Sequence, residues 1–338
     1  MRAAGSALPF IVRWQSAPAG PVPVVSTRLR FSERARNELA RWGYRRMHYS
    51  VTPGLYAAGA PGPDSPVLVS ANYKASFDRL RAQLSGIDAW ILVVDTKGIN
   101  VWCAAGKGTF SAAEAAHRLA ACGVPSLVRR RRLILPQLAA PGVSAHELAR
   151  LTGFQVVYGP VRAADLPEFL RHGCKADPAM RRVAFGFKER IALTPIEIVH
   201  AWKIALPILC LLWLHHVLTG KTADWNIGTA ILPYAGAILA GDVVVPAFLP
   251  WIPGRSFAFK GWLVGLVGAL AYIWASRIGP ASAAVYLTVL PAITGFLSLF
   301  FTGSSTFTSL SGVKKEMRIA VPAFSLLILT GIVLSFVL

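Results

Sequence analysis

AWILVVDTKGINVWCAAGK, residues 89–107, decides the fold of the N-terminal half of this chain. Its first eight residues are an almost continuous apolar run, which predicts a strand buried on both faces of a parallel sheet. Its last nine residues hold Cys103 beside a tryptophan and small residues. The segment therefore predicts a central strand followed by a short turn of chain that carries a single thiol.

Strand-like and helix-like segments alternate around this stretch. Predicted strands cover residues 65–71, 89–96, 131–137 and 154–160, and predicted helices cover 71–86, 109–121, 144–152 and 163–173. Ser111 and Glu114 have the spacing of a capping box at the start of the second helix. Repeated alternation of strand and helix predicts an α/β, Rossmann-like, doubly wound domain.

Ligands of doubly wound domains bind outside the carboxyl ends of the strands. Three segments leave predicted strands at that edge, namely SANYK (70–74), DTKGINVWCAAGK (95–107) and VVYGPVR (156–162). They bring Asn72, Tyr73, Lys74 and Cys103 to the expected ligand rim. A helix over residues 99–107 would present the thiol on a low surface, suited to a large flat ligand such as a metal macrocycle. The alternative is that Cys103 is a small buried residue without a chemical role.

The C-terminal part of the chain differs in composition from the rest. The 338 residues carry a net charge of +19, yet only eight Lys or Arg and three Asp or Glu lie in residues 200–338. Five apolar segments there approach the ~20 residues that a membrane-spanning helix needs. They cover about 200–219, 226–249, 259–276, 281–302 and 319–338. We therefore expect an all-α transmembrane domain of five helices, because a water-soluble helical core would need more polar surface.

These patterns divide the chain into an N-terminal extension (1–45), an α/β domain (46–180), a linker (181–199) and the transmembrane domain (200–338). Lys and Arg are concentrated before the first span and in alternate loops, which predicts a cytoplasmic N-terminal domain and an outer C-terminus. Asp242 lies within the second span and is a functional candidate, with a bond to a neighbouring helix as the alternative. His215 and His216 are expected at a membrane interface.

The remaining signals exclude several classes of protein. The four cysteines are too widely spaced to indicate a disulfide framework, a zinc site or an iron–sulfur cluster within the chain. No recognised RNA- or DNA-binding motif accompanies the positive charge, so we expect no nucleic-acid partner. An inward-facing domain beside anionic membrane lipid accounts better for that charge.

The segment NVWCAAGK, residues 100–107, resembles the cap-helix motif of the membrane-bound corrinoid proteins of bacterial and archaeal mercury methylation. The segments SANYKASFD (70–78), RRLILPQLAAPGVSAHE (131–147) and GFQVVYGPVRAADLPEFL (153–170) are similar to the corrinoid domain of the corrinoid iron–sulfur protein large subunit. The five-span tail distinguishes the mercury-methylating family from that soluble relative.

This resemblance implies a cobamide cofactor whose own base is displaced, with Cys103 as the lower axial ligand of cobalt. It also implies cofactor contacts from the cap segment and, more weakly, from the strand end. These residues are Asn100, Val101, Trp102, Cys103, Ala104, Ala105, Gly106 and Lys107, with Asn72, Tyr73 and Lys74. We expect Trp102 to pack the cap helix onto the domain. Lys107 would meet a corrin amide or phosphate, or remain solvated, and Asn100 would cap the helix or contact the corrin edge.

The resemblance further implies a corrinoid-dependent methyltransferase that converts Hg(II) to methylmercury in the cytoplasmic membrane. Its partners would be a methyltetrahydrofolate-linked methyl donor and a ferredoxin-like electron donor with two [4Fe–4S] clusters, because this chain lacks an iron–sulfur module of its own. Two alternatives stay open: a membrane-tethered corrinoid methyl carrier of one-carbon metabolism with another acceptor, and a non-catalytic corrinoid-binding transport or sensor module.

Overall fold

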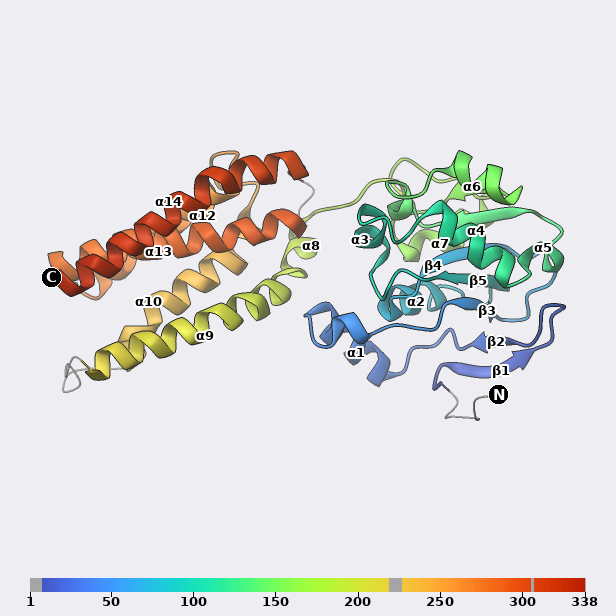
Figure 1. Cartoon of the computed structure of the whole chain (residues 1–338), viewed down its shortest axis with the longest axis horizontal. Helices are drawn as coiled ribbons and strands as arrows, with labels where there is room; N and C mark the ends of the chain where they lie inside the picture. The colour runs from blue at the N-terminus through green and yellow to red at the C-terminus, as the bar shows by residue number, and fades with distance from the viewer. Residues whose placement is uncertain (1–7, 219–226, 305–306, 338) are drawn as a thin grey trace. The chain divides into compact units, whose positions relative to one another are not determined.

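The computed structural model describes residues 8–218, 227–304 and 307–337 (Figure 1). The chain divides into two compact units, Met1–Val183 and Ala184–Leu338. The first unit, blue to green in Figure 1, contains a mixed sheet with helices, whereas the second, yellow to red, is helical. The units are described separately below.

The sheet of the first unit has seven strands in the order β1-β2-β3-β5-β4-β6-β7. The strands are β1 (Ile11–Gln15), β2 (Val22–Val25), β3 (Gly54–Ala58), β4 (Val67–Ala71), β5 (Ala89–Val94), β6 (Arg132–Leu135) and β7 (Gln155–Tyr158). Strands β5, β4, β6 and β7 are mutually parallel, and β3 is antiparallel to β5. The four strands predicted from the sequence are therefore confirmed, and they form a block of four adjacent parallel strands.

Both faces of the central strands are covered, which explains their continuous apolar sequence. Every residue of β4 and β5 is buried. Val67 and Val69 belong to the core on one face, with side chains of α3, α4 and α6, whereas Leu68 belongs to the core on the other face, with side chains of α2 and α7. Successive strand residues point to opposite faces, so the two cores establish the doubly wound arrangement.

The helices of the first unit follow the predicted order. They are α1 (Phe31–Arg41), α2 (Lys74–Arg81), α3 (Val101–Gly106), α4 (Ala112–Ala121), α5 (Val124–Leu127), α6 (Ala145–Thr152) and α7 (Leu166–Arg171), with short 3-10 turns η1 (Arg46–His48), η2 (Gln137–Ala139) and η3 (Ala163–Asp165). Ser111 caps α4 by accepting a hydrogen bond from the Glu114 amide at 3.2 Å. The Glu114 carboxylate bonds instead to the amide of Asp95 at 2.9 Å, so only half of the predicted capping box forms.

The segment predicted as an N-terminal extension contributes to the sheet. Strand β1 pairs with β2, and β2 pairs with β3. Helix α1 joins α2 through Glu33, which accepts a hydrogen bond from the buried Arg81 guanidinium at 2.6 Å. Prolines 21 and 23 interrupt the apolar pattern around β2, as is typical of strands near a sheet edge.

The second unit consists of helices. They are α8 (Phe187–Ile191), α9 (Thr194–Leu218), α10 (Ile227–Leu239), the π-helical segment η4 (Ala240–Val244), α11 (Val245–Phe248), α12 (Phe257–Ala275), α13 (Pro280–Phe300), the 3-10 turn η5 (Phe301–Ser304) and α14 (Leu310–Val337). Four helical stretches in the described residues are long and apolar enough to cross a membrane: Ile231–Phe248, Phe257–Ala275, Pro280–Phe300 and Ser311–Val337. They correspond to the last four predicted spans.

The first predicted span, residues 200–219, coincides with most of α9. Residue 219 and the side chains of most of the second half of α9, including His215 and His216, lie outside the described residues. A fifth membrane span therefore remains a prediction.

Small residues allow α12 and α13 to approach closely. A Cβ atom added at Gly265 would lie 2.7 Å from the Pro291 Cα, and one added at Gly261 would lie 2.3 Å from the Ser298 hydroxyl. This spacing of small residues is typical of helix pairs in membranes, where close backbone approach stabilises packing.

Candidate functional site

The carboxyl ends of the parallel strands border a pocket of about 590 Å³. Strands β4 and β6 are neighbours here. The connection after β4 forms α2 on one face of the sheet, and the connection after β6 forms α6 on the other face, so the pocket lies at the topological switch point of the sheet. Such points are the usual ligand sites of doubly wound folds. The lining comes from the end of β4, from α2, from the start of α3 and from the segments after β6 and β7.

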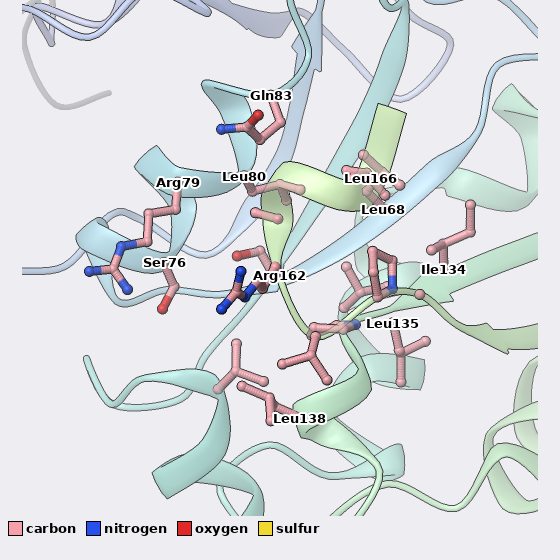
Figure 2. Close-up of a pocket in the computed structure, with 18 of the residues that line it drawn as sticks. Leu68, Ser76, Arg79, Leu80, Gln83, Ile134, Leu135, Leu138, Arg162 and Leu166 are labelled. Atoms are coloured by element: carbon pink, nitrogen blue, oxygen red, sulfur yellow. The ribbon is translucent and has the colours of Figure 1, made fainter. Parts of the chain in front are cut away.

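One wall of the pocket is apolar and the other carries polar groups (Figure 2). Figure 2 shows Ile134, Leu135 and Leu138 along the β6 segment, with Leu68 and Leu166 beside them. The polar groups include Ser76 and Arg79 of α2, Gln83 just after that helix, and Arg162 after β7. The combination suits a ligand that has an apolar part and an anionic or hydrogen-bonding part.

Helix α3 begins at Val101 because Asn100 caps it. The Asn100 side-chain oxygen accepts a hydrogen bond from the Cys103 amide at 2.9 Å, which satisfies one of the free amides at the start of the helix. Asn100, Val101 and Trp102 also line the pocket. The first turn of α3 therefore connects the pocket to the thiol-bearing residue.

Cys103 is exposed and forms no disulfide. The alternative of a small buried cysteine is therefore wrong for this residue. The next two residues, Ala104 and Ala105, are buried, whereas Gly106 and Lys107 are exposed. A Cβ atom added at Gly106 would meet nothing within 4 Å. The thiol thus lies at the surface of a short helix that is open beside it.

A glycine on the neighbouring loop determines how α3 is seated. A Cβ atom added at Gly142 would lie 2.5 Å from the Ala105 carbonyl oxygen and 2.6 Å from the Ala105 Cα. Only a glycine fits this approach without moving one of the two backbones. Since Ala105 is two residues from Cys103, this contact helps to fix the position of the thiol relative to the rest of the domain.

Trp102 does not pack α3 onto the domain core, although this role was expected for it. Its side chain is 43% exposed and lines the pocket. Instead, Ala104 of α3 is buried in the core, and the partly buried Val101 packs against that core. A helix of six residues has too few positions to bury consecutive side chains, and Val101 and Ala104 occupy the inward-facing pair three residues apart.

Asn72 supports the loop that leads into α3. Its side-chain oxygen accepts hydrogen bonds from the Thr96 amide at 3.1 Å, the Thr96 hydroxyl at 2.8 Å and the Gly98 amide at 2.9 Å. Its nitrogen donates to Asp95 at 3.2 Å. A direct cofactor contact from Asn72 remains a prediction, whereas its role in ordering residues 95–98 follows from these bonds.

Tyr73 and Lys74 also have partners within the domain. The Tyr73 ring is 6% exposed and packs edge-on against Tyr49. The Lys74 ammonium lies 2.5 Å and 2.6 Å from the two Asp78 carboxylate oxygens. Neither residue lines the pocket, so their expected contact with the cofactor rim remains a prediction without support from the pocket.

Electrostatic contacts add to the order of the loop before α3. The Lys97 ammonium donates to the Asp95 carboxylate at 2.6 Å, and this bond lowers the pKa of Asp95 despite partial burial. Asp95 also accepts the Lys97 amide at 2.9 Å. The loop is therefore held by side chains from both the strand end and the turn itself.

The other cysteines differ from Cys103 in place and exposure. Cys122 and Cys174 are half-buried, and Cys210 is an exposed residue of α9 in the helical unit. Burial raises the pKa of the Cys122 thiol. Within residues 8–218, 227–304 and 307–337, no group of three or more His, Cys, Asp or Glu side chains is placed to hold a metal ion.

Sequence reasoning missed the polar wall of the pocket. Ser76 and Arg79 lie three residues apart on α2, and Gln83 follows just after the helix ends; the helical spacing of Ser76 and Arg79 was a usable signal. Arg162 follows the Gly159–Pro160 turn after β7, within a segment that was expected at the ligand edge. No individual role had been assigned to these four residues.

Comparison with known proteins identifies the domain that carries this site. Residues 44–170 match the family model described as CdhD, CO dehydrogenase/acetyl-CoA synthase delta subunit. The chain is 32% identical over 122 residues to the acetyl-CoA decarbonylase/synthase complex subunit gamma of Archaeoglobus fulgidus and 34% identical over 122 residues to that of Methanopyrus kandleri. It is 31% identical over 123 residues to the corrinoid/iron-sulfur protein large subunit of Moorella thermoacetica.

These similarities are confined to part of each protein. Each covers 36% of this chain and 26% or 27% of the relative, so the chain spans about a quarter of the length of the curated relatives it matches. The matched part contains the pocket and α3, and it excludes the candidate membrane helices. Residues 44–170 therefore form a CdhD-family domain, homologous to the corrinoid/iron-sulfur protein large subunit and to the acetyl-CoA decarbonylase/synthase gamma subunits.

Proposed function

We propose that the CdhD-family domain binds a base-off corrinoid, with the Cys103 thiolate as the lower axial ligand of cobalt, and that the protein transfers a methyl group to Hg(II). The observation that carries this proposal is an exposed, unpaired thiol on the capped helix α3, beside a pocket at the ligand edge of the sheet. One homologue is a corrinoid/iron-sulfur protein, which suggests the class of cofactor.

The residues present fit a corrinoid. The exposed Cys103 thiol is accessible to a metal, and the space beside Gly106 is open for a flat ring. A thiolate is a soft ligand that suits a transition metal. Gly142 and Asn100 fix the helix that carries the thiol, which reduces the conformational freedom lost when a ligand binds.

The pocket beside α3 fits the nucleotide arm of a cobamide. A base that no longer binds cobalt needs an apolar site, and Ile134, Leu135 and Leu138 provide one. The arm also contains a phosphate, and the guanidinium groups of Arg79 and Arg162 lie on the polar wall. We assign the pocket to this arm and the exposed surface of α3 to the corrin ring.

A bound corrinoid would supply the methyl-transfer chemistry, since cofactors of this kind carry the reactive centre. The protein would supply the Cys103 thiolate as a ligand, and its negative charge would favour the oxidised metal. Trp102 would cover one side of the cofactor from the pocket edge, and Lys107 would remain available to a corrin amide or phosphate.

Mercury is proposed as the acceptor because the cap segment NVWCAAGK and the apolar C-terminal helices occur together, as in the mercury-methylating family. Hg(II) would be delivered as a thiol complex, since it is a soft ion. The methyl group would come from a methyltetrahydrofolate-linked donor, and electrons from a ferredoxin-like protein with two [4Fe–4S] clusters. The charge pattern of the loops supports a cytoplasmic position for the corrinoid domain.

Methylmercury formation by the full chain tests this function. The purified protein would be loaded with corrinoid and given a methyl donor, a reductant and thiol-bound Hg(II). We expect methylmercury from the natural protein and from Cys174→Ala, and none above background from Cys103→Ala. Equal activity of Cys103→Ala and the natural protein would refute a catalytic role for Cys103.

A second candidate function is a methyl carrier with a different acceptor. The homologous domains of acetyl-CoA decarbonylase/synthase subunits favour it, because the family match covers the proposed corrinoid site and none of the candidate membrane helices. In that case the methyl-loaded protein would keep its methyl group in the presence of Hg(II), and would lose it to a protein fraction that contains the natural acceptor.

A further inference from the structure

The helical unit contains a buried carboxylate with an unsatisfied oxygen. Asp242 is 2% exposed, and its Oδ2 atom has no hydrogen-bond partner among the residues that the structure describes. An isolated negative charge in an apolar environment is strongly unfavourable. The carboxyl group must therefore be neutral or be balanced by a bound cation.

The buried cations nearby are bonded to backbone carbonyls. Arg190 of α8 donates to the Ala247 carbonyl at 2.9 Å, and the Lys260 ammonium of α12 donates to the Leu249 carbonyl at 2.5 Å. The helices that pack against η4 carry other titratable side chains in their described parts, namely Glu197, His200, Lys203 and Cys210 of α9, Tyr234 of α10, Tyr272 of α12 and Tyr286 of α13. His200, Lys203 and Cys210 are exposed.

A second buried carboxylate belongs to a helix that packs against the same segment. Glu197 of α9 is 7% exposed. Helix α9 packs directly against η4. Two carboxyl groups that share an apolar site do not both ionise, because each charge raises the energy of the other.

The backbone around Asp242 is irregular in a way that is typical of functional sites. Residues 240–244 form a π-helical segment, which is rare and is often found where a side chain must be placed for function. Gly241 packs against α13, since a Cβ added there would lie 2.9 Å from the Thr294 carbonyl oxygen. A cavity of about 260 Å³ borders the segment and is lined by Ala237, Ala240 and Thr294 among others.

We propose that Asp242 and Glu197 form a proton-binding pair within the membrane domain, with Asp242 as the residue that carries the proton. The π-helical segment places the buried Asp242 carboxyl among the helices, and α9, which packs against that segment, contributes the second carboxyl group. The membrane domain would then bind and release a proton instead of serving only as an anchor. This inference does not depend on the corrinoid site.

Labelling with dicyclohexylcarbodiimide tests the pair, because this reagent modifies protonated carboxyl groups in apolar surroundings. The full-length protein in lipid vesicles would be labelled across a pH series, and the adduct located by peptide mass spectrometry. We expect an adduct at Asp242 that is lost as the pH rises and is absent in Asp242→Asn. In Glu197→Gln the loss should occur at lower pH, because one repelling charge is gone. Glu316→Gln should label as the natural protein does, since Glu316 accepts hydrogen bonds from Ser256 and Ala258.

Three results would overturn the proposal. These are the absence of an adduct at Asp242, an adduct whose yield does not change with pH, and protection by sodium ions at constant pH, which would indicate a metal cation in place of the proton. If Asp242→Asn does not fold, the shift in the pH of labelling in Glu197→Gln still decides the outcome.

Discussion

Replacement of Asn100 tests whether α3 is the element that presents the thiol. The Asn100 side chain provides the cap of a six-residue helix, through one hydrogen bond of 2.9 Å to the Cys103 amide. Loss of such a cap costs about 1 kcal/mol. If the cofactor binds only when α3 is formed, its affinity falls with the fraction of formed helix. At about 1.4 kcal/mol per tenfold change, Asn100→Ala should weaken corrinoid binding by up to about fivefold, the full effect requiring that α3 is mostly unformed in the free variant.

A series of substitutions separates capping from direct contact with the ligand. Serine and aspartate are good caps, glycine is intermediate and alanine is poor. We therefore expect Asn100→Ser to retain near-natural affinity, Asn100→Gly to fall between, and Asn100→Ala to bind most weakly. The assay is a titration of each full-length variant with corrinoid, followed by the absorption change on binding.

Two outcomes would refute this reasoning. If Asn100→Ser binds as weakly as Asn100→Ala, the amide contacts the ligand directly, and capping is not its main role. If Asn100→Ala binds as tightly as the natural protein, the position of α3 does not depend on its cap. The thermal stability of the three variants serves as a control, because a general loss of folding would lower all affinities together.

Three further predictions concern the framework of the domain. Gly142→Ala should displace α3 and weaken corrinoid binding about tenfold. The added Cβ would lie 2.5 Å from the Ala105 carbonyl oxygen, and overpacking of this kind costs about 1–3 kcal/mol. Unchanged affinity in the same titration would contradict this prediction. Asp78→Asn should lower stability by about 3 kcal/mol, since it removes a partner from the buried Arg81 guanidinium, and a melting temperature equal to the natural one would contradict it. Burial raises the pKa of Glu33, but the Arg30 amide and the nearby Arg81 and Lys74 outweigh burial and lower it below the ordinary 4.5. The stability that ionised Glu33 contributes is therefore complete above the ordinary pKa of 4.5, and it is lost as the pH falls through the lowered pKa. Acid should then lower the melting temperature of Glu33→Gln less than that of the natural protein.

The parallel part of the sheet was predictable because its signals are local. Strands β4 and β5 are buried on both faces, and each is therefore a continuous apolar run that stands out in the sequence. Strands β1 and β2 gave no such signal, because β1 is mostly exposed and β2 is bordered and interrupted by prolines. Their place in the sheet depends on pairing with β3, which only the folded chain shows.

The candidate site was predictable to a lesser degree. The ligand edge and the capped segment around Cys103 followed from the order of the strands and from Asn100. The roles of Asn72 and Trp102 could not be predicted in this way, because the burial or exposure of a side chain depends on neighbours that are distant in sequence. Asn72 bonds to residues more than twenty positions away, and Trp102 lies at the pocket instead of in the core.

X-ray absorption at the cobalt edge tests the central claim most directly. The full-length protein would be loaded with corrinoid, and the scattering atoms around cobalt compared between the natural protein and Cys103→Ala. We predict a sulfur neighbour of cobalt that disappears in the variant. An axial position filled only by nitrogen or oxygen in the natural protein would contradict the assignment of Cys103 as the ligand.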